Sequence, residues 1–358
     1  MKLTDIPHLR LYNQHIRDPL PGKPEDVVSW LCAVQAQDYA GAKWSLGLRL
    51  QNASDAEIEQ AFAAGSILRT HLLRPTWHFV TPEDIRWLLM LTAPRVHAVN
   101  ASMYRKLELD STVFTQCNKS LATALQGGWK STRDELRDVL LKAGIEVHHG
   151  QRLAYIMMNA ELEGLVCSGG RRGRQFTYAL LDERAPNSRI LLREEALSEL
   201  ARRYFTSRGP ATVHDFSKWS GLTLTDARGG LENIQTGLHQ ELVNGQVYWF
   251  SEPTLSAAEN THVAYLLSVY DEYISSYKDH SPIAAPEVGS RLAAMGNALQ
   301  NIIVLDSHIA GTWRRILTKH AVVIEVNPFS ILSDSDELRL ADAARRFGEF
   351  VGLPVEMR

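Results

Sequence analysis

The stretch Leu165–Leu180, LVCSGGRRGRQFTYAL, decides the fold that we expect for this chain. Two apolar runs flank the glycine-rich segment Gly169–Arg174, a pattern typical of two antiparallel strands joined by a hairpin. No acidic residue occurs between Gly164 and Leu181, so three arginines set the charge of the turn. Such a hairpin suits contact with phosphate or insertion into a minor groove, although a solvated surface turn can have the same composition.

Three helical segments precede this hairpin, and a glycine follows each of them. We expect helices near Thr112–Leu125, at Arg133–Lys142 and at about His149–Glu163. Ser131 or Thr132 supplies an N-cap for the second of them. Three helices followed by a basic hairpin form the layout of a winged helix, a unit that often binds DNA.

The same order of elements is expected before and after this unit. The first unit contains three helical segments and two strands around an Arg-Pro turn: Pro24–Val34, part of Ala42–Leu50, Ala56–Ala64 and the strands within Ser66–Val80. The third contains helices and a hairpin around Asn244-Gly245: Glu194–Thr206, Phe216–Trp219, Thr225–Ile234, Leu238–Leu242 and Gln246–Phe250.

The C-terminal part has a different pattern. Three strand-like runs and an amphipathic helix follow one another: Ile302–Leu305, Gly311–Ile316, Ala321–Val326 and Asp334–Gly352. We therefore predict an α+β protein with three tandem winged-helix units and a small β-rich C-terminal domain. The expected boundaries are 1–95, 96–185, 186–255 and 256–358.

The composition is that of a globular protein. The 358 residues are 45% hydrophobic with a net charge of −3, and no 18-residue apolar run occurs. Three isolated cysteines and an N-terminus without an apolar leader favour a cytoplasmic protein. The net charge does not favour a nucleic-acid partner, but a basic face can coexist with an acidic remainder. We expect a monomer without metal, cofactor or membrane partner; the adjacent His148 and His149 are poorly spaced to share one metal ion.

The polar run Gln35-Ala36-Gln37-Asp38 follows the apolar helical segment Val27–Val34. On a continuing helix the two glutamine side chains diverge. If the helix ends near Val34 and the chain extends, Gln35 and Gln37 point to one side and can share a target. A polar helix terminus is the alternative interpretation.

The segment Val34–Leu46 resembles the signature of the AlkZ-like winged-helix DNA glycosylases. Four further blocks agree with that family: Leu68-Arg69-Thr70, Arg74-Pro75-Thr76-Trp77-His78, Tyr270-Asp271-Glu272-Tyr273 and Gly311-Thr312-Trp313-Arg314-Arg315. The similarity runs from about Leu11 to Phe329, nearly the whole chain. One block departs from the family, because Tyr277-Lys278-Asp279-His280 has lysine and histidine where arginine is usual.

The resemblance implies that three winged-helix units form a concave surface for double-stranded DNA. It implies hydrolysis of the N-glycosidic bond of N7-alkylated purines, including bulky adducts and interstrand crosslinks, with Gln35 and Gln37 as the catalytic residues. We predict DNA contacts at eight positions: Arg69, Arg74, Lys130, Arg171, Arg172, Arg174, Tyr273 and Lys278.

The chemistry of glutamine agrees with these substrates. An N7-alkylguanine is cationic, so its base leaves without a general acid, and the enzyme has to place a water and stabilise the positive charge that grows on the sugar. The amide oxygens of Gln35 and Gln37 can do both, although an amide is no general base at neutral pH. No lysine stands out as a Schiff-base nucleophile, so we expect a monofunctional enzyme that leaves an abasic site.

Other interpretations remain open from the sequence. Asp38, or the pair Asp271 and Glu272, can supply a working carboxylate, or the pair can form an N-cap or a surface ion pair. A winged-helix transcription regulator without catalytic activity is the main alternative function. It needs a recognition helix, and His149–Glu163 offers few base-reading side chains. A protein-interaction scaffold also fits the net charge.

Overall fold

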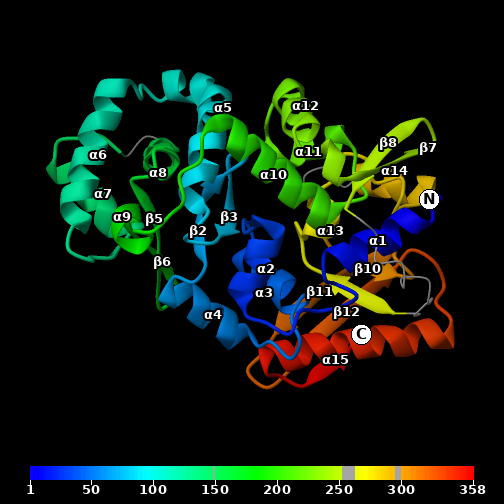
Figure 1. The fold of residues 1–358 in the computed structure, drawn as a ribbon. Coiled ribbons are helices and arrows are strands. Elements are labelled where there is room, and N and C mark those ends of the chain that lie inside the picture. The colour runs from blue at the N-terminus through cyan, green and yellow to red at the C-terminus, as the bar shows by residue number, and fades with distance from the viewer. Residues whose placement is uncertain (148–149, 252–262, 295–299) are drawn as a thin grey trace.

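The computed structural model describes residues 1–147, 150–251, 263–294 and 300–358. His148 and His149, which include the expected start of a helix, lie outside the described residues. The helices α6–α9 and the hairpin β5–β6 form one side of the molecule, and the C-terminal strands and α15 form the opposite side (Figure 1). Among the described residues, none of the helices combines the length and the apolar composition that crossing a bilayer requires.

The first part of the chain contains one repeat of helices and strands. After α1 (Asp5–Asn13), the elements are α2 (Pro24–Leu31), β1 (Val34–Gln35), α3 (Tyr39–Gly47), α4 (Asp55–Ala64), β2 (Leu68–Leu72) and β3 (Thr76–Val80). The strands form an antiparallel sheet in the order β1-β3-β2. The helix α5 (Ile85–Lys106) then leads to the second repeat.

The second repeat has the same order and the same sheet topology. Its elements are α6 (Ser111–Leu125), β4 (Ser131–Thr132), α7 (Arg133–Lys142), α8 (Arg152–Leu162), β5 (Val166–Arg172) and β6 (Gln175–Leu180), followed by α9 (Leu181–Arg184). The strand order is β4-β6-β5. The predicted hairpin is present, but its turn is shorter than the expected segment 169–174, because β5 runs to Arg172 and only Gly173 and Arg174 lie between the strands.

The third repeat is similar but has a smaller sheet. Its elements are α10 (Arg193–Arg208), α11 (Val213–Ser220), α12 (Leu224–Glu232), a 3-10 turn (Gln235–Gly237), β7 (His239–Val243) and β8 (Gln246–Phe250). An isolated bridge between Ala211 and Trp249 lies where the other repeats have their first strand. The order helix, extended segment, helix, helix, hairpin therefore occurs three times within the described residues.

The C-terminal part is a sheet covered by a helix. Its elements are β9 (Ala264–Leu267), α13 (Glu272–Ser275), α14 (Pro286–Ala294), β10 (Asn301–Leu305), β11 (His308–Leu317), β12 (Val322–Pro328), α15 (Asp334–Val351) and β13 (Val355–Met357). The strand order is β13-β12-β11-β10-β9. The strands and helix expected at 302–352 are present, with ends that differ by up to three residues.

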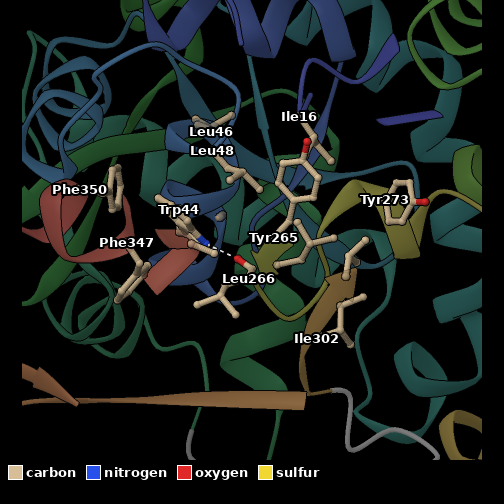
Figure 2. Packing of buried hydrophobic residues seen from close by; sticks show 14 of the residues in the cluster. Ile16, Trp44, Leu46, Leu48, Tyr265, Leu266, Tyr273, Ile302, Phe347 and Phe350 are labelled. Carbon is tan, nitrogen blue, oxygen red and sulfur yellow. Dashed lines mark hydrogen bonds between the residues drawn. The ribbon is translucent and has the colours of Figure 1, made fainter. Parts of the chain in front are cut away.

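One continuous core joins the C-terminal sheet to the first repeat (Figure 2). Trp44 of α3 contacts the rings of Phe347 and Phe350 of α15, at centroid distances of 5.0 and 5.1 Å. The indole Nε1 of Trp44 donates a hydrogen bond of 2.7 Å to the carbonyl oxygen of Leu266 in β9. The first repeat is therefore packed against residues that come more than 200 positions later.

Most differences from the expected elements are at helix ends. The helix α2 ends at Leu31 rather than Val34, and α3 begins at Tyr39 rather than Ala42. The segment 81–84 forms a turn, and α5 begins after it at Ile85. The two-residue strands β1 and β4 were not predicted as strands, because so short a strand has no measurable periodicity, although an extended segment after α2 was one of two options.

Candidate active site and DNA-contacting residues

The short strand β1 is held by the buried side chain of Arg208, at the end of α10. Its guanidinium donates hydrogen bonds to the carbonyl oxygens of Leu31 and Ala33, at 2.7 and 2.8 Å. Carbonyls at the end of a helix have no further helical partner, so these bonds satisfy them. Cys32, between them, has a φ of 63°, and the chain turns there out of α2 into β1.

Glu272, the first residue of α13, connects Arg208 to β1. Its Oε2 accepts from Arg208 Nη2 at 2.8 Å, and its Oε1 accepts from the backbone N–H of Gln35 at 2.9 Å. Both charged side chains are completely buried. Burial alone raises the pKa of Glu272, but Arg208 and hydrogen bonds from Ser276 and Gln35 lower this pKa to about 2. The Arg208–Glu272 pair therefore fixes the backbone of β1 with a permanently ionised carboxylate.

Gln35 lies opposite His78 of β3 in the sheet. The segment is extended, which is one of the two options that the sequence left open, but the side chain of Gln35 is only 8% exposed. Its Oε1 is buried and has no hydrogen-bond partner among the described residues. A buried amide oxygen without a partner costs free energy, so this position is unlike an ordinary core residue.

His78 is completely buried beside Gln35. Its Nδ1 lies 3.0 Å from the carbonyl oxygen of Thr76, and its Nε2 has no partner among the described residues. Burial, together with the charge of Arg74, lowers the pKa of His78 to about 3. The ring is therefore neutral at physiological pH.

Mild acid should destabilise the protein through His78. The pKa of this ring is depressed in the folded state, so between about pH 6.5 and 3 the unfolded chain binds a proton that the folded chain does not. The stability that the neutral ring contributes is complete above pH 6.5. It decreases as the pH is lowered below this value, by about 1.4 kcal/mol per pH unit for one proton. Urea unfolding of the parent and of His78→Gln at pH 7, 6 and 5 should give a shallower slope for the variant; parallel slopes would contradict this role.

Gln37 follows β1 and is exposed, unlike Gln35. Its Oε1 lies 3.5 Å from the backbone N of Trp77, which makes this a long hydrogen bond. The side chain borders a cavity of about 160 Å³, which lies between the first and second repeats. An engineered apolar cavity of about 150 Å³ holds one benzene molecule, so this cavity has room for about one ring.

The walls of this cavity come from both repeats. His71, Pro75 and Trp77 belong to the first, and the second supplies Arg133, Ala154, Met157, Met158 and Tyr178. The rings of His71 and Trp77 are 4.3 Å apart, and the guanidinium of Arg69 lies 4.3 Å from the Trp77 ring. The cavity beside Gln37 is therefore lined by aromatic and thioether groups with a few polar atoms.

The alternative carboxylates are all engaged in structural contacts. Asp38 caps α3, accepts from the N–H of Gly41 at 3.2 Å and lies 3.6 Å from Arg315. Asp271 caps α13 and forms a buried ion pair with Arg49 at 2.8 Å, and Glu272 is paired as described above. Asp271 is therefore an N-cap, as one alternative from the sequence proposed. The ion pairs of Asp271 and Glu272 are buried, whereas the other alternative from the sequence was a surface ion pair.

The eight predicted DNA-contacting residues differ in exposure and fall into three groups: exposed, half-buried and buried. Four of them are exposed: Lys130, Arg172, Arg174 and Lys278. Arg172 forms an ion pair with Glu135 at 2.7 Å. Arg171 is half-buried and lies 3.1 Å from Glu59, and Arg74 is half-buried near the Arg208–Glu272 pair.

Two of the predicted DNA contacts are corrected by the structure. Tyr273 is completely buried, and its hydroxyl donates to the carbonyl oxygen of Ser307 at 2.7 Å, so it does not face a ligand. Arg69 is 8% exposed, donates to the carbonyl oxygen of Ala36 and lies against Trp77. Both residues support the fold around β1 and the C-terminal sheet rather than forming a DNA surface.

Three residues of this region were not identified from the sequence. They are Arg208, which was not among the candidate site residues, and the pair His71 and Glu161, which belong to different repeats, 90 positions apart. A single sequence gives no signal for such a pairing. The only hint for His71 is its place between the two arginines of the block 69–74.

Comparisons with known proteins agree with the order of elements. The sequence model of a family described as DNA glycosylase AlkZ-like matches residues 28–350. An interstrand DNA cross-link repair glycosylase from Streptomyces sahachiroi is 26% identical over 320 residues, which cover 85% of this chain and 85% of that protein. The structure of the Streptomyces sahachiroi DNA glycosylase AlkZ is 21% identical and covers 100% of both chains with a TM-score of 0.82.

Proposed function

Since the chain belongs to the AlkZ-like DNA glycosylase family, and is therefore a DNA glycosylase, we propose that it hydrolyses the N-glycosidic bond of cationic N7-alkylated purines in double-stranded DNA. Gln37 and Gln35 are the catalytic residues of this proposal. The observation that carries it is the exposed carboxamide of Gln37, at the rim of a ring-sized cavity and directly after a strand that a buried ion pair fixes.

The three repeats are, in this proposal, winged-helix units that together hold the duplex. Their shared order of helix, extended segment, helix, helix and hairpin supports this assignment. The hairpin of the second repeat presents Arg172 and Arg174 at its tip, where phosphates can be bound.

The reaction uses the positive charge that alkylation puts on the purine. Departure of the neutral alkylated base leaves positive charge on C1′ of the sugar, and amide oxygens of Gln37 and Gln35 stabilise this charge and position the attacking water. Gln35 is enclosed, and its buried Oε1 has no hydrogen-bond partner among the described residues, so in this proposal it acts as a fixed dipole two positions before Gln37. Since the described residues that line the cavity include no lysine nucleophile, the product is an abasic site with an intact strand.

The proposal predicts a requirement for a charged lesion. Release of 7-methylguanine from a duplex should exceed release of uracil or hypoxanthine by about 10²-fold or more, because an uncharged base leaves only with a general acid, which contributes typically 10²–10⁴-fold. Alkaline cleavage of the resulting abasic sites measures this. Comparable rates for neutral and charged bases would refute the proposed chemistry. An intact strand with every lesion would instead favour a DNA-binding regulator.

The similarity to a crosslink-repair glycosylase suggests that larger lesions are also substrates. We propose that crosslinked and bulky purines are also substrates. Pockets for drug-sized molecules measure roughly 300–1,000 Å³, whereas the cavity at Gln37 measures about 160 Å³. A bulky adduct therefore has to remain outside this cavity, and cleavage of such a lesion does not require its insertion.

The basic hairpin should contribute to affinity through phosphates. Arg172→Ala/Arg174→Ala is expected to weaken duplex binding and to reduce the magnitude of the negative slope of log K against log salt by about 0.9 for each phosphate that the variant no longer binds. The rate constant at saturating enzyme should change little. Arg345→Ala, an exposed arginine of α15 that pairs with Glu349, is the matched control. An unchanged slope in the hairpin variant would exclude the hairpin from the interface.

A further inference from the structure

The cavity beside Gln37 has a polar wall that the glutamine chemistry does not use. His71 of β2 and Glu161 of α8 form a hydrogen-bonded pair through Nδ1 of the imidazole and Oε2 of the carboxylate. The two residues are 4% and 1% exposed. A carboxylate buried to this extent needs a partner, and within the described part of the chain the imidazole of His71 is the side chain that hydrogen bonds to it.

This contact fixes the direction of the imidazole ring. With Nδ1–H donating to the carboxylate of Glu161, the other ring nitrogen, Nε2, carries the lone pair. Among the described residues no group hydrogen bonds to Nε2 of His71, and His71 lines the same cavity as Gln37. His78, the neighbouring histidine in the sheet, differs because its Nε2 is completely enclosed.

His71 and Gln37 lie on either side of the same residue. The register of β2 and β3 places His71 opposite Trp77, with the two rings 4.3 Å apart. The amide oxygen of Gln37 lies 3.5 Å from the backbone N of Trp77. Gln37 and His71 therefore border one cavity, from neighbouring positions on either side of Trp77.

Hydrolysis releases a proton that a glutamine cannot accept. We propose, resting on the proposed function, that His71 is a catalytic residue that takes this proton from the attacking water, and that Glu161 is the positioning residue that orients it. The arrangement of carboxylate, imidazole and reacting group follows the same logic as the hydrolytic triads, in which the carboxylate sets the tautomer and stabilises the imidazolium.

The step balances in atoms and electrons. The bond between C1′ and the purine nitrogen breaks, and its electron pair leaves with the base, which becomes a neutral alkylated purine. The water oxygen forms a bond to C1′, and one of its protons passes to Nε2 of His71. The imidazolium, paired with Glu161, then returns this proton to solvent.

Several ionisable groups surround the imidazole from the neighbouring elements. They are Glu161 on α8, Arg69 on the same strand, Arg133 on α7, Tyr178 on β6 and His78 on β3. Protonation of His71 before the reaction removes the acceptor, so the rate should fall on the acid side.

The test is the single-turnover release of 7-methylguanine from a duplex, measured between pH 5 and 9. In the parent the rate should fall tenfold per pH unit below an inflection. His71→Gln should be about 10²-fold slower at high pH, as expected for loss of general-base catalysis, and should lack this inflection, with unchanged duplex affinity. Glu161→Gln should also slow release at high pH and should retain the acid inflection, because it keeps the imidazole and removes only the group that orients it. The matched control is His97→Gln, because His97 pairs with Glu163 at 3.1 Å beside a different cavity.

The outcomes separate this inference from the proposed function. A parent that releases no 7-methylguanine at any pH refutes the proposed function and the inference together. An active parent with an unchanged rate and pH profile in His71→Gln refutes only the role of His71. If the variant does not fold, nitrogen NMR of the parent decides, since the His71 ring must titrate at the kinetic inflection; titration at another pH overturns the inference.

Discussion

Replacing Gln37 with alanine is expected to lower the single-turnover rate of 7-methylguanine release by about 10²- to 10³-fold, the range typical for removal of one preorganised polar group from an active site. The side chain is exposed and makes one long hydrogen bond, so its loss should not affect folding. Duplex affinity should be nearly unchanged, because the amide acts on charge that develops only in the transition state.

Two further variants sharpen this result. Gln51→Ala removes an exposed glutamine that follows α3 in the chain, and this variant should keep the parental rate. Gln35→Ala should also slow release, but it alters a buried position, so its melting temperature has to be measured as well. A Gln37→Ala enzyme within threefold of the parental rate would remove Gln37 from the mechanism.

Replacing Arg208 with methionine is expected to cause the largest loss of stability. The variant leaves the buried carboxylate of Glu272 without its ion-pair partner and the carbonyl oxygens of Leu31 and Ala33 without donors. Breaking a buried ion pair by removing one partner costs about 3–5 kcal/mol. With roughly 2–4 °C per kcal/mol, the melting temperature should fall by about 10 °C.

The appropriate control removes an exposed ion pair of the same chemistry. Arg345 lies 2.6 Å from Glu349 on the surface of α15, and such pairs contribute about 0.3–0.5 kcal/mol. Arg345→Met should therefore melt within about 2 °C of the parent. Adding Glu272→Gln to Arg208→Met should recover part of the lost stability, since the unpaired charge is then gone. An Arg208→Met protein that melts like the control would exclude the Arg208–Glu272 pair as a support of β1.

The sequence predicted the repeated elements well because capping residues and turns are local signals. Ser54 and Thr132 cap α4 and α7, and Gly65 and Gly221 end α4 and α11 in the left-handed conformation, as their types suggest. The Asn244-Gly245 turn joins β7 to β8 for the same reason. These features depend on residues only a few positions apart.

The candidate site was predicted less completely because its geometry depends on distant contacts. The extended conformation after α2 was predicted as one of two options, but the burial of Gln35 follows from β3 and α13. Likewise, Tyr273 lies in a motif that suggested DNA, yet its environment is set by Ser307. Burial is a property of the assembled fold, and a linear pattern does not contain it.

The hydrogen bond from the backbone N–H of Gln35 to the carboxylate of Glu272 joins positions that are 237 residues apart. A chain emerging from the ribosome therefore carries both glutamines long before the carboxylate that anchors their backbone has been synthesised. Since domains fold as units from the N-terminus, the first repeat can acquire its helices early but not this anchor. The chain consequently completes the support of β1 only near the end of translation, and fragments that stop before residue 272 lack the hydrogen bond that fixes this strand.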